Sequence, residues 1–234
     1  MSQKSWGLKI GLILGAIFIT ALVWNKSLNP SADDPTSIPS TNLTDTSPNS
    51  IQSPPDLGIF YPIAGYRSRI TNRDHGKETT LELSRGFACG GQFEGIHIGD
   101  DLEVTAEELN QEIPVFAIAK AVVRQIKAVG GYGGLLITEQ TVNNQVTTAY
   151  YGHISLKKAK VKTGDTVTAG QPLTYLAENC SVESSNERKH LHFAIHKGTS
   201  IDVRGYVTTR EALDQWLDPQ ELLQQLGAAE PKLN

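Results

Sequence analysis

Residues 189–196 read Lys-His-Leu-His-Phe-Ala-Ile-His, and their alternation predicts a β-strand. Successive side chains of a strand point to opposite faces. The three histidines and Ala194 would therefore share one face, while Leu191, Phe193 and Ile195 would form the apolar face that anchors the strand. Neighbouring imidazoles need polar partners or a ligand. We interpret the histidine face as a candidate metal-binding face, and the alternative is an edge strand whose histidines point into water.

A second cluster upstream offers further metal-binding side chains. In the sequence Gly-Ile-His-Ile-Gly-Asp-Asp, His97 and Asp101 are separated by three residues, with Gly99 between them. Glycine permits a tight backbone turn that would bring the imidazole and the carboxylate together. With one histidine of the pair His190 and His192, they supply two nitrogens and one oxygen. This donor set suits zinc with an open position, as in hydrolytic sites, whereas Asp101 alone would be interpreted as a surface carboxylate.

The composition argues against nucleic acid as the main partner. The 234 residues include 21 Lys and Arg and 25 Asp and Glu, which gives a formal net charge of -4. Such a balance predicts no broad basic surface. The length suits one full domain with additional segments. We therefore expect a small or peptidic partner.

The N-terminus carries a charge-free apolar run from Ile10 to Trp24, with lysines on both sides. This pattern is typical of a secretory signal or an uncleaved membrane anchor, and we favour the anchor because no small-residue cleavage site ends the run. A buried core helix is the alternative. The tract that follows is rich in Ser, Thr, Pro, Asn and Asp, which predicts a disordered tether. The expected organisation is an N-terminal segment 1–26, a linker 27–57, a β domain 58–205 and a C-terminal helical extension 206–234.

Short β-branched and aromatic stretches between turn residues predict a mainly β domain with an antiparallel sheet. Glycine-rich residues 130–134 and the Lys-Thr-Gly-Asp segment 162–165 predict turns. Near the C-terminus, Asp218-Pro219-Gln220-Glu221 predicts the start of a short amphipathic helix, and residues 210–216 are expected to form another helical turn. The expected strands are 66–71, 115–119, 121–126, 135–138, 145–151 and 172–176.

A third histidine, His153, stands at the end of a predicted strand. The motifs His-x-Gly-x-Asp at 97–101, Tyr-x-His at 151–153 and His-Leu-His-Phe at 190–193, in this order, resemble the lysostaphin- and LytM-type zinc endopeptidases that cut peptide cross-links in bacterial cell walls. The resemblance covers residues 61–197 and includes the Gly-Gly-Tyr-Gly-Gly turn and the Gly-Asp-Thr-Val-Thr-Ala-Gly-Gln hairpin. It implies a barrel-sandwich-hybrid-like metallopeptidase domain.

The resemblance also implies the roles of the motif residues. His97, Asp101 and His192 would bind Zn²⁺, and His153 and His190 would be catalytic. The implied chemistry is coherent, because zinc lowers the pKa of a bound water and a free imidazole can accept a proton or stabilise an oxyanion. The implied partners are peptidoglycan peptides, with cell-wall or division regulators as further candidates, and the implied location is the cell envelope, outside the cytoplasm.

Two further histidines are expected to lie outside this site. His196 would share the face of His192, but it lies about 13 Å further on at roughly 3.3 Å per residue, too far to bind the same ion. His75 is expected to be a solvated loop residue.

Two segments depart from the family pattern. Residues 103–112 form a longer acidic insert, and residues 178–188 form a polar loop where the family usually has a glycine-rich one. Both are expected to border the cleft and to alter what it accepts, without touching the metal ligands.

Three other functions compete with the peptidase. A non-catalytic relative could present the groove to another cell-wall hydrolase. The Val-x-x-Gly-Asp-x-Val-x-x-Gly-Gln-x-Leu hairpin also resembles lipoyl- or biotinyl-type hybrid domains of anchored transport adaptors, although that interpretation leaves the histidine and aspartate positions unexplained. A cysteine hydrolase with Cys180 and His190 is weaker, because nothing near Cys180 predicts a lowered thiol pKa.

The two cysteines, Cys89 and Cys180, are candidates for a disulfide. They precede the first ligand and the histidine strand by similar short distances, so two segments that meet at the metal would carry them to the same rim of the cleft. Export would place them in an oxidising compartment, where a disulfide persists. The alternative is two unconnected buried thiols.

Overall fold

The computed structural model describes residues 58–70, 73–81, 89 and 92–233. The predicted N-terminal segment 1–26 and linker 27–57 lie outside the described residues, and the proposed domain boundaries stay predictions. None of the helices in the described part of the chain has the length and apolar character of a membrane span.

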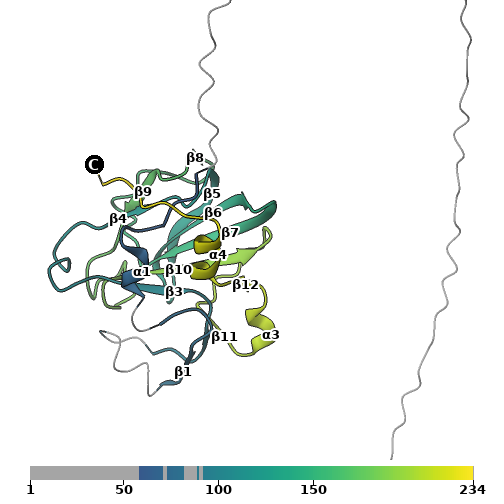
Figure 1. Ribbon diagram of the computed structural model, residues 1–234. Helices are drawn as coiled ribbons and strands as arrows, with labels where there is room; N and C mark the ends of the chain where they lie inside the picture. Colours follow the sequence, from purple (N-terminus) through teal and green to yellow (C-terminus); the bar gives the residue numbers. More distant parts are fainter. Residues whose placement is uncertain (1–57, 71–72, 82–88, 90–91, 234) are drawn as a thin grey trace, which may run out of the picture. The chain divides into compact units, whose positions relative to one another are not determined.

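An antiparallel sheet built around β10 (His190–Lys197) is the main element of the fold (Figure 1). Its strands follow the order β12-β10-β7-β6-β5-β8. On the side of β10 opposite β7, β3 pairs with the first half of the strand and β12 pairs with the second half. The mainly β, antiparallel fold predicted from the sequence is confirmed. The other strands of the sheet are β3 (Asp100–Glu103), β5 (Ala121–Val129), β6 (Gly133–Val142), β7 (Gln145–Gly152), β8 (Thr166–Val167) and β12 (Trp216–Leu217).

Two smaller sheets accompany the main one. The first has the order β1-β2-β11, and it brings strands that precede the main sheet in the chain next to β11, which lies between β10 and β12 in the chain. The second pairs β4 with β9. Their strands are β1 (Glu78–Thr79), β2 (Gly95–His97), β11 (Tyr206–Val207), β4 (Pro114–Phe116) and β9 (Pro172–Tyr175).

Apolar side chains cover both faces of β10. Leu191, Phe193 and Ile195 belong to one core cluster, which also contains Leu223 of α4 (Pro219–Gln225). Ala194 belongs to a second cluster, formed with residues of β2, β11 and α3 (Arg210–Leu213). The predicted alternation is therefore correct, but the histidine face is buried beneath a second layer. Each fully buried large apolar side chain contributes about 1.5–3 kcal/mol to folding.

The strand register fixes which side chains meet. His192 lies opposite Asp101 of β3 on one side and opposite Gly152 of β7 on the other. Between β2 and β3 the chain passes very close to β10 at Gly99. A Cβ at this position would lie 2.2 Å from the carbonyl oxygen of Phe193, and no positive φ is involved. Gly99 therefore permits a close approach of two backbones, where the sequence had suggested only a tight turn.

The prediction of a strand over residues 66–71 was wrong, because the segment forms the helical turn α1 (Tyr66–Arg69). Gly65 has a φ of 69° and turns the chain, and its carbonyl accepts from the backbone N–H of Ser68 at 3.0 Å. The tyrosine is buried and donates its hydroxyl hydrogen to Asp100. Tertiary contacts of Tyr66 thus override the extended preference of the residues that follow.

The other local predictions agree well with the structure. The expected strands after residue 114 overlap β4, β5, β6, β7 and β9. Both predicted turns form, with Gly131 and Gly164 at positive φ. The C-terminal helix α4 is capped as predicted, since Asp218 Oδ1 accepts from the backbone N–H of Glu221 at 3.0 Å. The strands β2 and β3, which carry the first motif, were not predicted.

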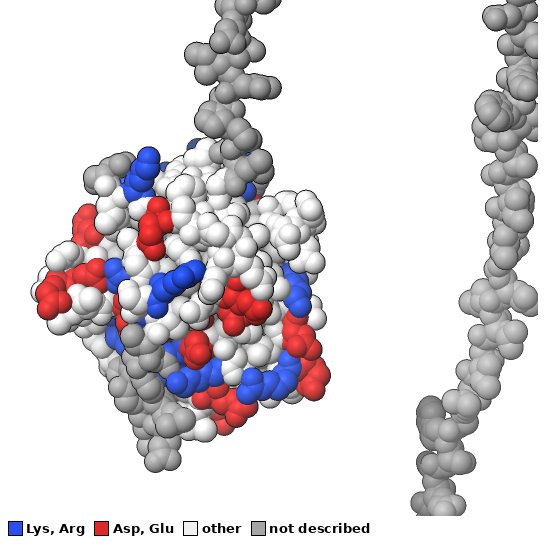
Figure 2. All heavy atoms as spheres, viewed as in Figure 1, with Lys and Arg blue, Asp and Glu red and all other residues white. Residues whose placement is uncertain are grey.

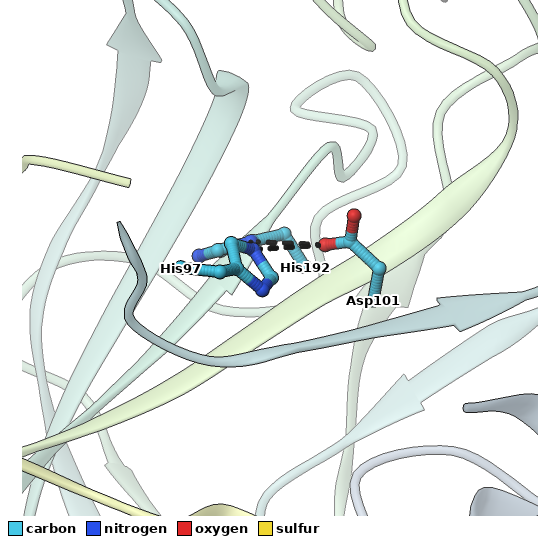
Figure 3. Close-up of side chains that lie close together, drawn as sticks. All are labelled: His97, Asp101 and His192. Atoms are coloured by element: carbon cyan, nitrogen blue, oxygen red, sulfur yellow. Dashed lines mark hydrogen bonds and ion pairs between the residues drawn. The ribbon is translucent and has the colours of Figure 1, made fainter. Parts of the chain in front are cut away.

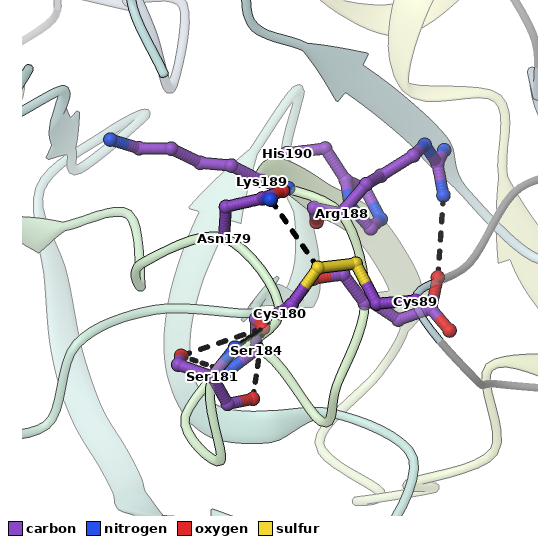
Figure 4. The surroundings of a disulfide bond; sticks show 9 residues. Cys89, Asn179, Cys180, Ser181, Ser184, Arg188, Lys189 and His190 are labelled. Carbon is purple, nitrogen blue, oxygen red and sulfur yellow. Dashed lines mark hydrogen bonds and ion pairs between the residues drawn. A yellow bond between two sulfur atoms is a disulfide. The ribbon is translucent and has the colours of Figure 1, made fainter. Parts of the chain in front are cut away.

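Cys89 and Cys180 form a disulfide, with their Cα atoms 5.5 Å apart (Figure 4). This is the pair that the sequence had indicated. The bond attaches the polar loop 178–188 to the segment before β2. The carboxylate of Glu183 holds the same loop to the sheet, because it accepts from Ser155 Oγ at 2.8 Å and from the backbone N–H of Leu156 at 3.1 Å.

We predict that Gly99→Ala destabilises the protein by about 1–3 kcal/mol or more, because the added methyl group would overlap β10. Gly130→Ala is the matched control: a Cβ there meets no heavy atom within 4 Å, and its stability should change by less than about 1 kcal/mol. Urea unfolding followed by circular dichroism measures both. Equal stability of the two variants would contradict the close approach.

We predict that the disulfide stabilises the fold by several kcal/mol. It closes a sequence separation of 91 residues, for which the chain-entropy model gives about 4–5 kcal/mol. Cys89→Ser, Cys180→Ser and the double variant should lose similar amounts in urea unfolding. Mass spectrometry after alkylation of the non-reduced protein is the direct check, and two alkylated thiols in folded protein would exclude the bond.

Candidate metal centre

The side chains of His97, Asp101 and His192 converge on one point (Figure 3). His97 Nε2 lies 2.9 Å from His192 Nδ1 and 3.3 Å from Asp101 Oδ1. His192 Nδ1 lies 3.1 Å from the same carboxylate oxygen. The structure thus brings together the three residues that the family resemblance implied as zinc ligands.

The three donor atoms fit a zinc ion. Tetrahedral ligands at about 2.0–2.1 Å from zinc lie about 3.3 Å from one another, so the observed separations need little adjustment. His97 Nδ1 lies 3.4 Å from the carbonyl oxygen of Asp74. Since a carbonyl only accepts, this contact places the proton on Nδ1 and leaves the Nε2 lone pair for a metal, as a supporting partner does in known sites.

The ionisation states also suit a metal. Burial alone raises the pKa of Asp101, but the imidazoles of His190 and His97 outweigh this effect and hold its pKa well below the ordinary value. Burial lowers the pKa of His192 to about 4 despite its hydrogen bond to Asp101. Near pH 7 the site therefore offers a carboxylate and a neutral imidazole, which are the metal-binding forms.

His190 and His153 lie beside the three converging residues. His190 Nε2 is 3.5 Å from Asp101 Oδ1, and its Nδ1 donates to the carbonyl of Arg188 at 2.8 Å. The rings of His190 and His153 are 4.4 Å apart between centroids. Burial lowers the pKa of His153 well below its ordinary value, so this imidazole is neutral. Neither histidine belongs to the converging group, which agrees with separate roles.

His153 has an unusual backbone conformation, with φ of 57°. A non-glycine residue in this region costs about 1 kcal/mol or more and is held there by its surroundings. Here the backbone N–H of His153 donates to Tyr132 at 3.1 Å, and its carbonyl accepts from Ala177 at 2.9 Å. The Nδ1 atom is buried and lacks a hydrogen-bond partner within the described residues.

A cleft opens over the site. Asp101, His153, His190 and His192 line it, and the more deeply buried His97 lies beneath. The rest of the wall includes Arg73, Phe93, Tyr132, Glu187, Arg188 and Tyr206.

Arg188 contacts the candidate site, and the sequence analysis missed it. Its Nη2 donates to Asp101 Oδ2 at 3.0 Å, and its Nε lies 2.9 Å from both carboxylate oxygens of Glu103. The contact occupies the outer oxygen of Asp101 and leaves Oδ1 facing the imidazoles. The sequence did contain a signal for Arg188. It precedes His190 and His192 at a spacing of two residues, which places all three on the same face of an extended strand.

Two tyrosines of the site were also missed. Tyr132 lies in the glycine-rich turn, with its ring centroid 5.3 Å from that of His192. Tyr206 is paired with His97 in the register of β11 and β2, and its ring centroid lies 5.0 Å from that of His97. Tyr132 belongs to a segment that the family resemblance included, whereas no local pattern marks Tyr206, which is brought in by long-range pairing.

The remaining histidines lie apart from the converging group. His196 contacts Trp216, with ring centroids 4.7 Å apart. His75 was expected to be solvated, but its side chain is only 14% exposed and lies 4.0 Å from Asp218. This expectation was wrong because the turn that carries His75 packs on Asp100, whose Oδ1 accepts from the backbone N–H of His75 at 3.0 Å.

The expectations for the two unusual segments were correct only in part. The polar loop 178–188 does line the cleft, through Glu187 and Arg188. The loop also touches a predicted ligand, Asp101, which had not been expected. The acidic insert lines a separate hollow, because Arg69 pairs with Glu108 at 2.7 Å and holds the insert there.

The cysteine-hydrolase alternative is wrong. Cys180 is bonded to Cys89 and therefore has no thiol to serve as a nucleophile.

Comparisons with known proteins agree with the motifs. The model of Peptidase family M23 matches residues 96–203. No curated protein is similar enough to be counted as a match. Similar solved structures include LytU, with 23% identity, a TM-score of 0.46, and coverage of 67% of this chain and 85% of that one. The solution structure of lysostaphin has 19% identity, a TM-score of 0.42, and coverage of 70% and 62%. A zinc-containing peptidase from Vibrio cholerae has 18% identity, a TM-score of 0.42, and coverage of 63% and 41%.

The matched segment contains all five histidine and aspartate positions of the candidate site. This segment, residues 96–203, is therefore similar to Peptidase family M23, in agreement with the family resemblance of its motifs.

Proposed function

We propose that the chain is a zinc-dependent endopeptidase that hydrolyses peptide bonds in peptidoglycan stem or cross-bridge peptides. The convergence of His97, Asp101 and His192 at the base of a cleft, with His153 and His190 beside them, carries the proposal. The family supports a peptidase, and the donor set supports zinc. When bound, zinc would polarise the scissile carbonyl and lower the pKa of a water molecule towards neutrality.

The two remaining histidines suit proton transfer. The carbonyl of Arg188 accepts from His190 Nδ1, so Nε2 is the ring nitrogen that faces the site, 3.5 Å from Asp101 Oδ1. The neutral His153 has its ring next to that of His190. One imidazole can accept the proton of the attacking water, and the other can stabilise the oxyanion or protonate the leaving amine. Burial of both groups keeps competing water away.

The site of action follows from the substrate. Peptidoglycan lies in the cell envelope, so the domain would act outside the cytoplasm. It would stay held to the membrane if residues 1–26 are retained as an anchor, and it would be released if they are cleaved as a signal. Figure 2 shows Lys and Arg interspersed with Asp and Glu on the viewed face. A cell-wall or division regulator as a further partner, and the absence of a nucleic-acid partner, stay predictions.

The experiment that tests the proposal is digestion of purified sacculi. The chain should release soluble peptide fragments, detected by mass spectrometry, and a chelator should stop the release. The non-catalytic alternative predicts a different outcome, in which the chain alone releases nothing but increases release by a second hydrolase.

We predict that the purified chain holds about one zinc ion and that His97→Ala or Asp101→Ala loses it, because each removes one of three ligands. His196→Ala is the control, since His196 lies on β10 outside the converging group and its loss should leave zinc content unchanged. Atomic absorption on folded protein measures all four samples. Full zinc content in both ligand variants would refute the site.

We predict that His153→Ala and His190→Ala keep their zinc but lose hydrolysis by about 10²-fold or more, as expected for an acid–base or oxyanion group. Metal content and the rate of peptide release are measured on the same preparations. If His190→Ala loses zinc as completely as His192→Ala, the ligand has been assigned to the wrong histidine.

A further inference from the structure

Glu187 is a buried carboxylate that the proposed hydrolysis does not use. Its side chain is 1% exposed, yet it lines the same cleft as His153 and His190. Its Oε1 atom is buried and has no hydrogen-bond partner among the described residues. Its Oε2 atom lies 3.5 Å from Arg188 Nη1, which is the limit of a hydrogen bond. A buried carboxylate oxygen without a donor is costly, so this atom has the capacity to bind one.

The two arginines of the cleft form contacts with groups other than Glu187 Oε1. Arg188 binds Asp101 and Glu103. Arg73 donates from Nη1 to the hydroxyl of Tyr206 at 2.6 Å, and its guanidinium carbon lies 5.5 Å from the ring centroid of Phe93. Both guanidinium groups lie near enough to lower the pKa of Glu187, but neither forms a hydrogen bond with its Oε1 atom, which keeps its capacity to accept one.

The backbone around Glu187 is fixed in place. Its carbonyl accepts from the backbone N–H of Cys180 and from Ser184 Oγ, both at 2.9 Å. The neighbouring disulfide and the contacts of Glu183 hold the same loop. The carboxylate is therefore positioned before a ligand arrives, which lowers the entropic cost of binding.

The chemistry of the cleft wall indicates a cationic ligand group. Burial raises the pKa of Glu187 to about 6, so the group is mostly ionised at pH 7. The ring of Tyr132 lines the same cleft, whereas the guanidinium group of Arg73 already lies over the rings of Phe93 and Tyr206. Carboxylates donate nothing when ionised and accept strongly from ammonium groups, and aromatic faces attract cations.

We propose that Glu187 is a specificity-determining residue that binds an ammonium group of the substrate peptide close to the cleaved bond. The inference rests on the proposed function and narrows its substrate class to peptides with a free amine, such as the side chain of a diamino acid. The polar loop that replaces the usual glycine-rich segment would thus select the substrate.

The test uses soluble peptides released from sacculi, either intact or with their amines acetylated, because acetylation removes the charge. Calorimetry on the catalytically inactive His153→Ala chain measures binding of both forms. We expect about tenfold tighter binding of the intact peptide, equivalent to about 1.4 kcal/mol. Adding Glu187→Gln should reduce this ratio to about one, whereas Glu187→Asp should keep part of it.

Glu178→Gln is the matched control, because Glu178 is an exposed acid at the start of the same loop and should leave the ratio at about ten. Thermal unfolding verifies that each variant is folded. A ratio near one in the parent chain, or an unchanged ratio in Glu187→Gln, overturns the inference even if the chain cleaves both peptides. Preferential binding of the intact peptide without any cleavage by the wild-type chain supports the inference and refutes the proposed hydrolysis.

Discussion

The pairing of β3 with β10 is the interaction on which the site depends. In this register His192 lies opposite Asp101. A slip by one residue would turn the histidines of β10 towards the opposite face and into the apolar core, because side chains alternate along a strand. The close approach of the backbone at Gly99 to β10 supports the same register, since any side chain at this position would push the backbone of β10 away. Packing and the convergence of the three donor side chains therefore impose the same constraint.

Burial of several polar groups in one place is tolerated because their charges are complementary. Asp101 is ionised, with Arg188 on one oxygen and imidazoles on the other. His192 and His153 are kept neutral by burial. A buried carboxylate without such partners would cost several kcal/mol. A metal ion would replace the contacts among the three donor atoms and leave the outer ion pair intact.

The two segments that depart from the family pattern form one structure. Arg188 of the polar loop binds Glu103 at the start of the acidic insert. The ammonium group of Lys189 donates to backbone carbonyls of the insert, at 3.3 Å for Glu108 and 3.1 Å for Leu109. Both cations immediately precede the histidine strand. A change in either segment would therefore reach the site through Arg188.

The sequence by itself determined the features that depend on local patterns of residues. The alternation of residues 190–196, the capping sequence at Asp218 and the glycine turns identify the central strand, the last helix and the hairpins. The order of the histidine and aspartate motifs indicated the similarity to Peptidase family M23 that residues 96–203 show. Periodicity and turn chemistry depend on neighbouring residues, so these features can be recognised without a structure.

Only the tertiary structure decided which distant residues complete the site. Tyr206 reaches His97 through the pairing of β11 with β2, and Glu187 reaches the cleft through a loop held by a disulfide. Tyr66 forms a helical turn because its hydroxyl binds Asp100 in the core. Each of these outcomes depends on contacts between segments that are far apart in the chain. Local sequence patterns do not reveal such contacts, because these contacts stabilise the fold only after the sheets have assembled.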